Sequence, residues 1–177
     1  LADFVLRTRH LPLTTDWATT HYALPSLMVF ILCCMLLFNL FSLIYSWGVL
    51  LPLWVLCIPL LLALLLFHVQ RNRLDFEEVP TRLSIEEIGN LFIELAEVHE
   101  WSIDHLGYDC IVAHTNPSMW SFTWGEHIFV VYDSGRVWLN SVNNLDRRSS
   151  IVSFGYTRRN LRWIVEAIRA REYGGAK

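Results

Sequence analysis

Acidic residues and histidines stand next to each other at two places in the second half of the chain, and such pairs can carry acid–base chemistry. Glu126-His127 would face Asn140-Ser141 if the two segments pair as neighbouring strands. A carboxylate or an imidazole held beside a substrate can transfer a proton to it. Such a site also needs a cleft, and structural hydrogen bonding is the simpler interpretation. We therefore assign no catalytic residue and expect no enzyme; catalysis by Glu126 and His127 on a membrane-proximal substrate is the least favoured alternative.

A second group has the donor atoms of a metal site: His99, Glu100, Asp104 and His105. We expect these residues to span the end of a helix and the start of a strand, which would not bring four side chains to one point, so we predict no metal site. His21 and His68 would lie at one depth beside a long apolar stretch. Two imidazoles at one depth can bind a haem or a chlorin. No second pair and no c-type attachment sequence accompanies them, so we predict no cofactor.

Composition and the absence of known motifs argue against several other classes of protein function. The chain contains no P-loop, GxGxxG, HExxH or GxSxG sequence. Its four cysteines form no CxxC pair, which argues against a zinc knuckle or a disulfide framework. The net charge of −3 at pH 7 gives no general attraction to nucleic acid. Residues 101–135 also lack the basic side chains that a single-strand binding platform interleaves with its aromatic rings.

The chain as a whole is organised around the apolar stretch 24–68. No Asp, Glu, Lys or Arg occurs between Asp16 and Arg71. A helix that crosses a membrane needs about 20 apolar residues, so the stretch is long enough for two helices. Ser46-Trp47-Gly48 is the only plausible turn, because glycine allows the chain to reverse. The sequence predicts a helical hairpin, 24–45 and 49–67, that crosses the membrane twice.

Arginines on both sides of the hairpin predict its orientation. Arg7 and Arg9 precede it, Arg71 and Arg73 follow it, and the turn carries no charge. Basic residues accumulate on the cytoplasmic side of a membrane. We therefore expect a multi-pass protein of the cytoplasmic (inner) membrane with both termini in the cytoplasm. Residues 1–23 are predicted to form a leader, apolar and basic at its start, that lies on lipid or on a partner protein.

Asn39 and Ser42 are the polar residues that the first helix would carry into the membrane, and their spacing places them on one face. A membrane-buried asparagine usually forms a hydrogen bond to another helix. We predict a helix-packing role for both residues, with Asn39 bonded to a neighbouring subunit or to the second helix. Satisfaction by Tyr45, Ser46 or a backbone carbonyl of the same chain is an equal alternative.

The rest of the chain predicts a small α+β domain. A charged junction at 69–83 leads into the domain at 84–173, and 174–177 form a tail. Ser84 and Glu87 form a capping box at the start of a helix. Four strands are expected at 101–103, 110–115, 126–132 and 136–142, and a last helix at 157–173. The predicted order is α-β-β-β-β-α, with an antiparallel sheet covered by two helices.

The charges of this domain are polarised, and the last helix carries an arginine cluster: Arg158, Arg159, Arg162 and Arg169. Either this helix pairs with the acidic first helix, or it faces anionic lipid or an acidic partner. Without catalytic motifs, the leading hypothesis is a non-catalytic accessory or assembly subunit of a larger membrane complex, with membrane lipid and other subunits as partners. The alternative is a membrane-tethered sensing or ligand-binding module. Its pocket would be the aromatic sheet: Trp120, Phe122, Trp124, Phe129, Tyr132 and Trp138.

Overall fold

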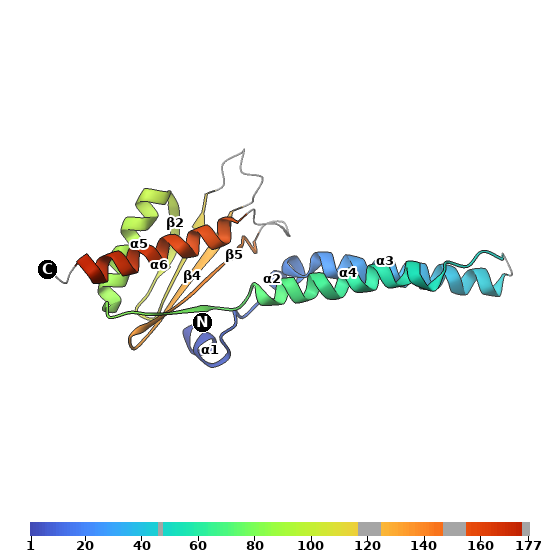
Figure 1. The fold of residues 1–177 in the computed structure, drawn as a ribbon, viewed down its shortest axis with the longest axis horizontal. Helices are drawn as coiled ribbons and strands as arrows, with labels where there is room; N and C mark the ends of the chain where they lie inside the picture. Colours follow the sequence, from blue (N-terminus) through green and yellow to red (C-terminus); the bar gives the residue numbers. More distant parts are fainter. Residues whose placement is uncertain (46–47, 117–124, 147–154, 175–177) are drawn as a thin grey trace.

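A computed structural model describes residues 1–45, 48–116, 125–146 and 155–174 and shows an α+β domain from which a long two-helix hairpin projects (Figure 1). Its described helices are α1 (Ala2–Thr8), α2 (Thr15–His21), α3 (Ala23–Ile44), α4 (Leu53–Asn72), α5 (Ile85–His99) and α6 (Tyr156–Gly174). The described strands are β1 (Glu77–Pro80), β2 (Trp101–Leu106), β3 (Cys110–Thr115), β4 (Glu126–Asp133) and β5 (Arg136–Asn143).

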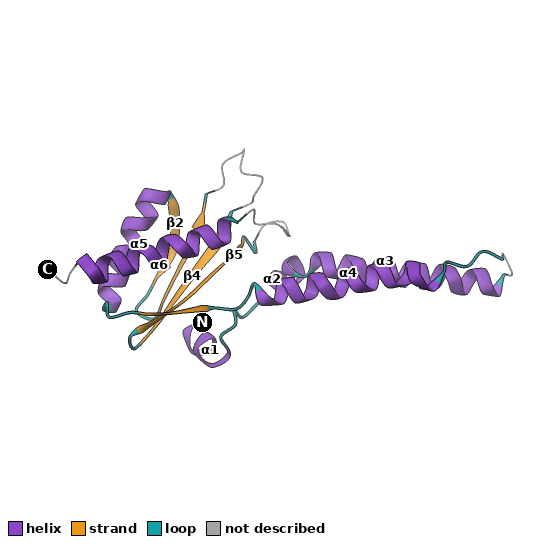
Figure 2. Cartoon of the chain, viewed as in Figure 1, coloured by secondary structure: helices purple, strands orange, loops and turns teal. Residues whose placement is uncertain are grey.

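Helices α3 and α4 form the hairpin, and both are long and apolar enough to cross a membrane. Helix α3 matches the predicted 24–45, but α4 begins at Leu53 instead of residue 49. Pro52 has an extended backbone, with φ −66° and ψ 150°, and a proline disfavours helix in the residue before it. The return segment before α4 is therefore a loop (Figure 2). The predicted turn residues Ser46 and Trp47 lie outside the described residues, while Gly48 has φ +69°.

The sheet has the strand order β1-β5-β4-β3-β2, and all neighbouring strands are antiparallel. The predicted order of elements was incomplete, because β1 was assigned to the charged junction. In this edge strand only Val79 is buried, opposite Val137 of β5. Four residues with one core side chain carry too little alternation to indicate a strand.

Helices α5 and α6 cover one face of the sheet (Figure 1). The predicted capping box at Ser84 and Glu87 is confirmed at the start of α5. Alternate strand residues such as Ile128, Val130 and Leu139 point into this core, where they meet Phe92 and Ile164. This arrangement fits the two helices predicted to cover the sheet.

The N-terminal leader covers the other face of the sheet. Val5 of α1 is fully buried in a second core with Phe129 and Trp138. We expected the leader to lie on lipid or on a partner; the structure places Val5 on the sheet of its own chain. Phe4 stays 46% exposed. The leader thus acts as part of the domain, although the hairpin separates the two in sequence.

Candidate functional site

The pleat of β4 separates the two residues that the sequence placed side by side. Consecutive strand residues point to opposite faces of a sheet. Glu126 and Ser141 lie on the face covered by α5 and α6, whereas His127 and Asn140 lie on the face covered by the leader. Glu126 and His127 therefore do not meet at one substrate position.

Glu126 is held inside the domain by its neighbour on β3. The Thr115 hydroxyl donates a hydrogen bond of 2.8 Å to Glu126 Oε2, and the Glu126 backbone N–H donates one of 2.8 Å to Thr115 Oγ1. Burial raises the pKa of Glu126, which the hydrogen bond from Thr115 partly opposes. Within the described residues, the buried Glu126 Oε1, Ser141 Oγ and Asn160 Nδ2 have no hydrogen-bond partner.

His127 meets a second histidine on the leader side of the sheet. His114 of β3 is its register partner, and the two ring centroids are 6.4 Å apart. Each histidine has an aspartate: His114 Nδ1 lies 2.8 Å from Asp104 Oδ2, and His127 Nε2 lies 3.4 Å from Asp146 Oδ2. These groups border a cavity of about 310 Å³, the His–Asp cleft, together with Trp17 and Asn144.

Five parts of the chain position the side chains of the His–Asp cleft: α2, β2, β3, β4 and the segment after β5. Asp104 is the extra residue of a bulge in β2, which shifts the register between Ile103 and His105. Asp146 follows β5 and its backbone N–H donates to Asn144 Oδ1 over 2.9 Å. The Trp17 indole N–H of α2 donates to Asp146 Oδ1 over 2.8 Å. Because α2 leads directly into α3, the cleft lies between the sheet and the base of the hairpin.

The electrostatics of the cleft favour a neutral His127. Burial lowers the pKa of His127, the carboxylates of Asp146 and Asp104 act in the opposite direction, and His114 adds to the lowering. His127 is 6% exposed, and its buried Nδ1 has no hydrogen-bond partner in the described part of the chain. An imidazole nitrogen without a partner can donate to or accept from a polar ligand.

The cleft offers side chains that can bind a polar molecule. Its described lining contains imidazoles, carboxylates, an amide and an indole, but no hydroxyl or thiol that a His–Asp pair could activate. In the residues that the structure describes, no group of three or more His, Cys, Asp or Glu side chains is placed to hold a metal ion. The cleft can therefore hold a small polar molecule by hydrogen bonds and charge.

The histidines and acids that were considered as a metal site, and not predicted to form one, make separate contacts in the structure. The His99 ring stacks on Trp163, with centroids 3.8 Å apart and planes at 7°. Burial lowers the pKa of His99, and the positive charge of Arg159 adds to that effect. Asp104 turns to His114, while His105 packs beside Gly107 in the β2–β3 turn. His99, Asp104 and His105 therefore make contacts in three different places and do not converge on one point.

The two histidines beside the apolar helices also contact their own chain. His21 Nε2 lies 2.8 Å from the Gln70 backbone oxygen, and His21 is buried. His68 Nε2 lies 3.1 Å from the Asn72 side-chain nitrogen, one turn away on α4. His21 thus joins the bases of the two helices, and the two rings form no common ligand pair.

Asn39 and Ser42 bind the return segment that precedes α4. Asn39 Nδ2 donates to the Leu51 backbone oxygen over 3.2 Å, and the Leu51 N–H donates to Asn39 Oδ1 over 2.8 Å. The Ser42 hydroxyl donates to the Val49 backbone oxygen. Of the two alternatives left open, the structure shows the contact within the chain, just before the second helix. The side chains supply bonds that the extended segment cannot make for itself.

The predicted arginine cluster lies along α6 with exposed side chains: Arg158, Arg159, Arg162 and Arg169. The Arg159 guanidinium is 4.2 Å from the centroid of the Tyr156 ring. Arg162 Nε lies 3.8 Å from Glu166 Oε1, an exposed pair one turn apart. Exposed pairs of this kind contribute little to stability, so these side chains remain available at the surface.

Sequence reasoning missed four of the polar and aromatic residues that line the His–Asp cleft: His114, Trp17, Asn144 and Asp146. His114 could have been found from the sequence. It lies near the end of predicted strand 110–115, and His127 lies near the start of the next strand, so antiparallel pairing would bring the two histidines together. Trp17 and Asp146 had no such signal, since these two contact residues are 129 positions apart in the chain. Their contact depends on how the leader folds back over the sheet.

Comparisons of this chain with protein-family models, with curated proteins and with solved structures found no significant match.

Proposed function

We propose that this chain is a non-catalytic accessory or assembly subunit of a larger membrane protein complex, anchored in the cytoplasmic membrane by α3 and α4. One observation carries the proposal: the chain itself buries only 6% of the most apolar window of α3 and 17% of that of α4. At 1.5 Å per residue the helices are about 33 Å and 30 Å long, close to the thickness of the hydrocarbon layer. An apolar surface of this size is stable in contact with lipid or with the helices of a partner protein.

The junction between hairpin and domain supports an assembly role. Leu11 N–H donates to the Leu74 oxygen over 2.9 Å, and Phe76 N–H donates to the Arg9 oxygen over 2.9 Å. The Asn140 amide donates to backbone oxygens on the same segment, including that of Asp75 at 2.6 Å. These bonds attach both ends of the hairpin to the sheet. A domain fixed in this way presents the same surface to a neighbouring subunit.

The charge distribution agrees with a cytoplasmic domain. Arg71 and Arg73 follow the apolar part of α4, and the first turns of α6 lie toward the hairpin (Figure 1). Arg158 in those turns is exposed and can reach anionic headgroups. Arg169 is about 16 Å farther along α6, on the part that points away from the hairpin, where a protein partner is the better match.

Purification of the full chain from its native membrane in a mild detergent tests the proposal. We expect a membrane protein to co-purify in a fixed ratio, and we expect the chain to resist extraction by alkaline carbonate. A clean monomer that carries a bound small molecule would contradict the accessory role. Release by carbonate would contradict the anchor itself.

A membrane-tethered ligand-binding module is the second candidate, and the His–Asp cleft favours it. Phe129 and Trp138 are only 2% and 4% exposed, so these rings of the predicted aromatic pocket fill the core. Trp120, Phe122 and Trp124 lie outside the described residues. Thermal shift measurements with small polar ligands should then show stabilisation of the wild type that His127→Ala abolishes. Equal shifts in both proteins would remove this candidate.

A further inference from the structure

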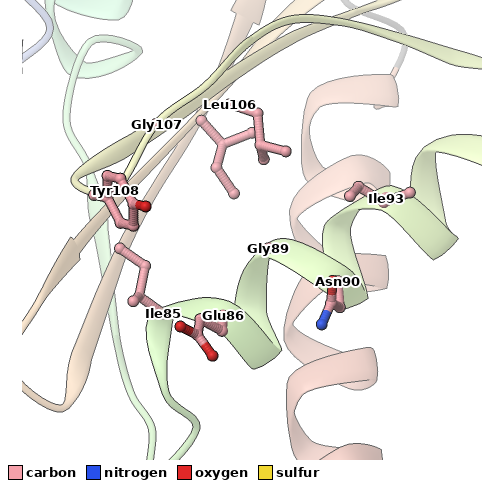
Figure 3. A pocket seen from close by; sticks show the side chains of 9 residues that line it. Ile85, Glu86, Gly89, Asn90, Ile93, Leu106, Gly107 and Tyr108 are labelled. Carbon is pink, nitrogen blue, oxygen red and sulfur yellow. The ribbon is translucent and has the colours of Figure 1, made fainter.

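We propose that an apolar groove beside α5 docks a positively charged segment of a cytoplasmic partner protein, which inserts a large apolar side chain over Gly89. The groove has a volume of about 470 Å³ and lies between α5 and the β2–β3 turn (Figure 3). Side chains that line it include those of Ile85, Glu86, Ile93, Leu106 and Tyr108. The proposal depends on the proposed function only in placing the domain in the cytoplasm.

Among the described apolar side chains that line the groove, only Ile111 belongs to the buried core of the domain. Ile85, Gly89 and Ile93 are four residues apart and share one face of α5. Across the groove, Leu106 is 50% exposed and Tyr108 is 87% exposed. Figure 3 shows these side chains around the open space beside Gly89. Apolar side chains gathered around a hollow indicate a contact surface.

Gly89 gives the groove its depth. A glycine inside a helix is about 1 kcal/mol less favourable than alanine, so its presence calls for a reason. A Cβ added at Gly89 would meet no atom of the chain within 4 Å. Gly107 in the facing turn differs, because its Cβ would lie 2.6 Å from His105 Nε2. Nothing inside the described chain requires glycine at residue 89, and the space it leaves can accept a side chain from outside.

The charge around the groove selects a basic partner. No Lys or Arg occurs between Arg82 and Arg136. Glu86 borders the groove, and Asp109 follows Tyr108 in the facing turn. Glu86 forms no ion pair with any residue that the structure describes. An unpaired carboxylate beside an apolar hollow attracts Lys or Arg and repels acidic segments.

The position of the groove argues against lipid as its occupant. Helix α5 lies on the side of the domain remote from the hairpin (Figure 1). With the hairpin in a membrane, this side faces water. A negatively charged rim would also be repelled by anionic headgroups. A soluble, basic protein segment satisfies both conditions.

The test uses the full chain in nanodiscs of zwitterionic lipid and a random-peptide display library as the probe. We expect the enriched peptides to combine Lys or Arg with a large apolar residue. Gly89→Trp, which fills the hollow, and Glu86→Arg, which reverses its charge, should each weaken binding of an enriched peptide about tenfold, or about 1.4 kcal/mol. Val98→Trp and Glu97→Arg make the same changes at exposed positions of α5 outside the groove and should leave binding unchanged.

Several outcomes would overturn the proposal. Enrichment of acidic or uncharged peptides would contradict the charge argument, and equal binding by the Gly89→Trp variant would contradict the insertion. Self-association that Glu86→Arg abolishes would assign the groove to a second copy. If the Gly89→Trp variant loses its helical circular dichroism signal, it has not folded. The Glu86→Arg variant, changed at an exposed position, then tests the proposal by itself. Groove variants leave the hairpin unchanged, so a negative result here is distinct from the absence of a co-purifying membrane partner.

Discussion

Asn39 shows how one amide can replace backbone bonds in an apolar setting. Pro52 keeps the segment before α4 extended, so the N–H and C=O of Leu51 have no partner in a helix. The Asn39 amide binds both groups, as a neighbouring strand would. In hydrocarbon no water is present to satisfy them. The nitrogen and the oxygen of the Asn39 amide both form hydrogen bonds within the chain. Asn39 therefore stabilises the hairpin itself, whereas contact with a partner was the other alternative.

Asn39→Leu should therefore weaken the hairpin itself. The substitution leaves Leu51 without its two bonds, and we expect a loss of about 1 kcal/mol, typical of polar contacts between membrane helices. Thermal unfolding of the chain in detergent measures this loss. Leu40→Ile, at an exposed neighbouring position, is the control. A melting temperature equal to that of the wild type would show that the contact contributes nothing.

His127 makes stability depend on pH. Burial lowers its pKa, so the unfolded chain binds a proton more readily than the folded chain. The contribution of a neutral His127 to the free energy of unfolding is fully present above the pKa of histidine in the unfolded chain, about 6.5. This contribution decreases as the pH falls from that value toward the pKa of His127 in the folded chain. His127→Asn should reduce this decrease. Melting temperatures of both proteins at about pH 7.5 and about pH 5.5, on either side of the unfolded value, test the prediction.

A comparison between the two proteins is needed because other groups titrate as well. His99 has a lowered pKa, and Glu126 a raised one, both because of burial. Their contributions cancel in the difference between wild type and variant. An equal decrease in both proteins would show that His127 is not the group responsible.

At the scale of elements, segments on both sides of the hairpin complete the sheet. Helix α1 covers the face opposite α5 and α6, and β1 extends the sheet beside β5. The His10–Asp75 bridge connects the two segments, with His10 Nδ1 at 2.8 Å from Asp75 Oδ1. The domain therefore cannot close its second core without the leader.

Val5→Ala should destabilise the domain. Val5 is fully buried between α1 and the sheet, and removing methyl groups from such a core costs about 1–3 kcal/mol. Thermal unfolding measures the effect. Phe4→Ala, at an exposed position on the same helix, should change stability by less than about 0.5 kcal/mol. Equal effects of the two changes would mean that α1 does not pack as described.

At the scale of the whole molecule, the proposed orientation follows from where the charges lie relative to the hairpin. The end that joins the domain carries Arg71 and Arg73, while the described residues at the other end, 43–45 and 48–51, carry no charge. Basic residues close to the ends of membrane helices accumulate on the cytoplasmic side, so these two arginines favour a cytoplasmic position for the end that joins the domain. This pattern supports the proposed cytoplasmic location of the domain and both termini.

Cysteine labelling of whole cells tests this topology. In a variant without the four native cysteines, Val49→Cys at the hairpin tip should react with an impermeant reagent added outside. Tyr173→Cys at the end of α6 should react only after the membrane is opened. Both positions are exposed, so access to the reagent depends on the membrane. The opposite labelling pattern would reverse the orientation.

Local patterns determined much of this protein without any structure. The uncharged stretch between Asp16 and Arg71 indicated two long helices. Ser84 and Glu87 marked the start of α5, because a capping box involves only groups within one turn. The turn residues Asp133-Ser134-Gly135, which lie between the two predicted strands 126–132 and 136–142, indicated the hairpin of β4 and β5. Each of these features depends on neighbours in sequence, so the residues themselves carry the information.

Only the tertiary structure decided which distant groups meet. The return of the leader over the sheet brings Trp17 to Asp146, and the strand register brings His114 to His127 while it separates Glu126 from His127. The extended segment before α4 gives Asn39 its partner, Leu51, and β1 pairs with the edge of the sheet that β5 offers. These contacts join segments that share no local pattern, and their free energy comes from burial and pairing after the chain has folded back on itself.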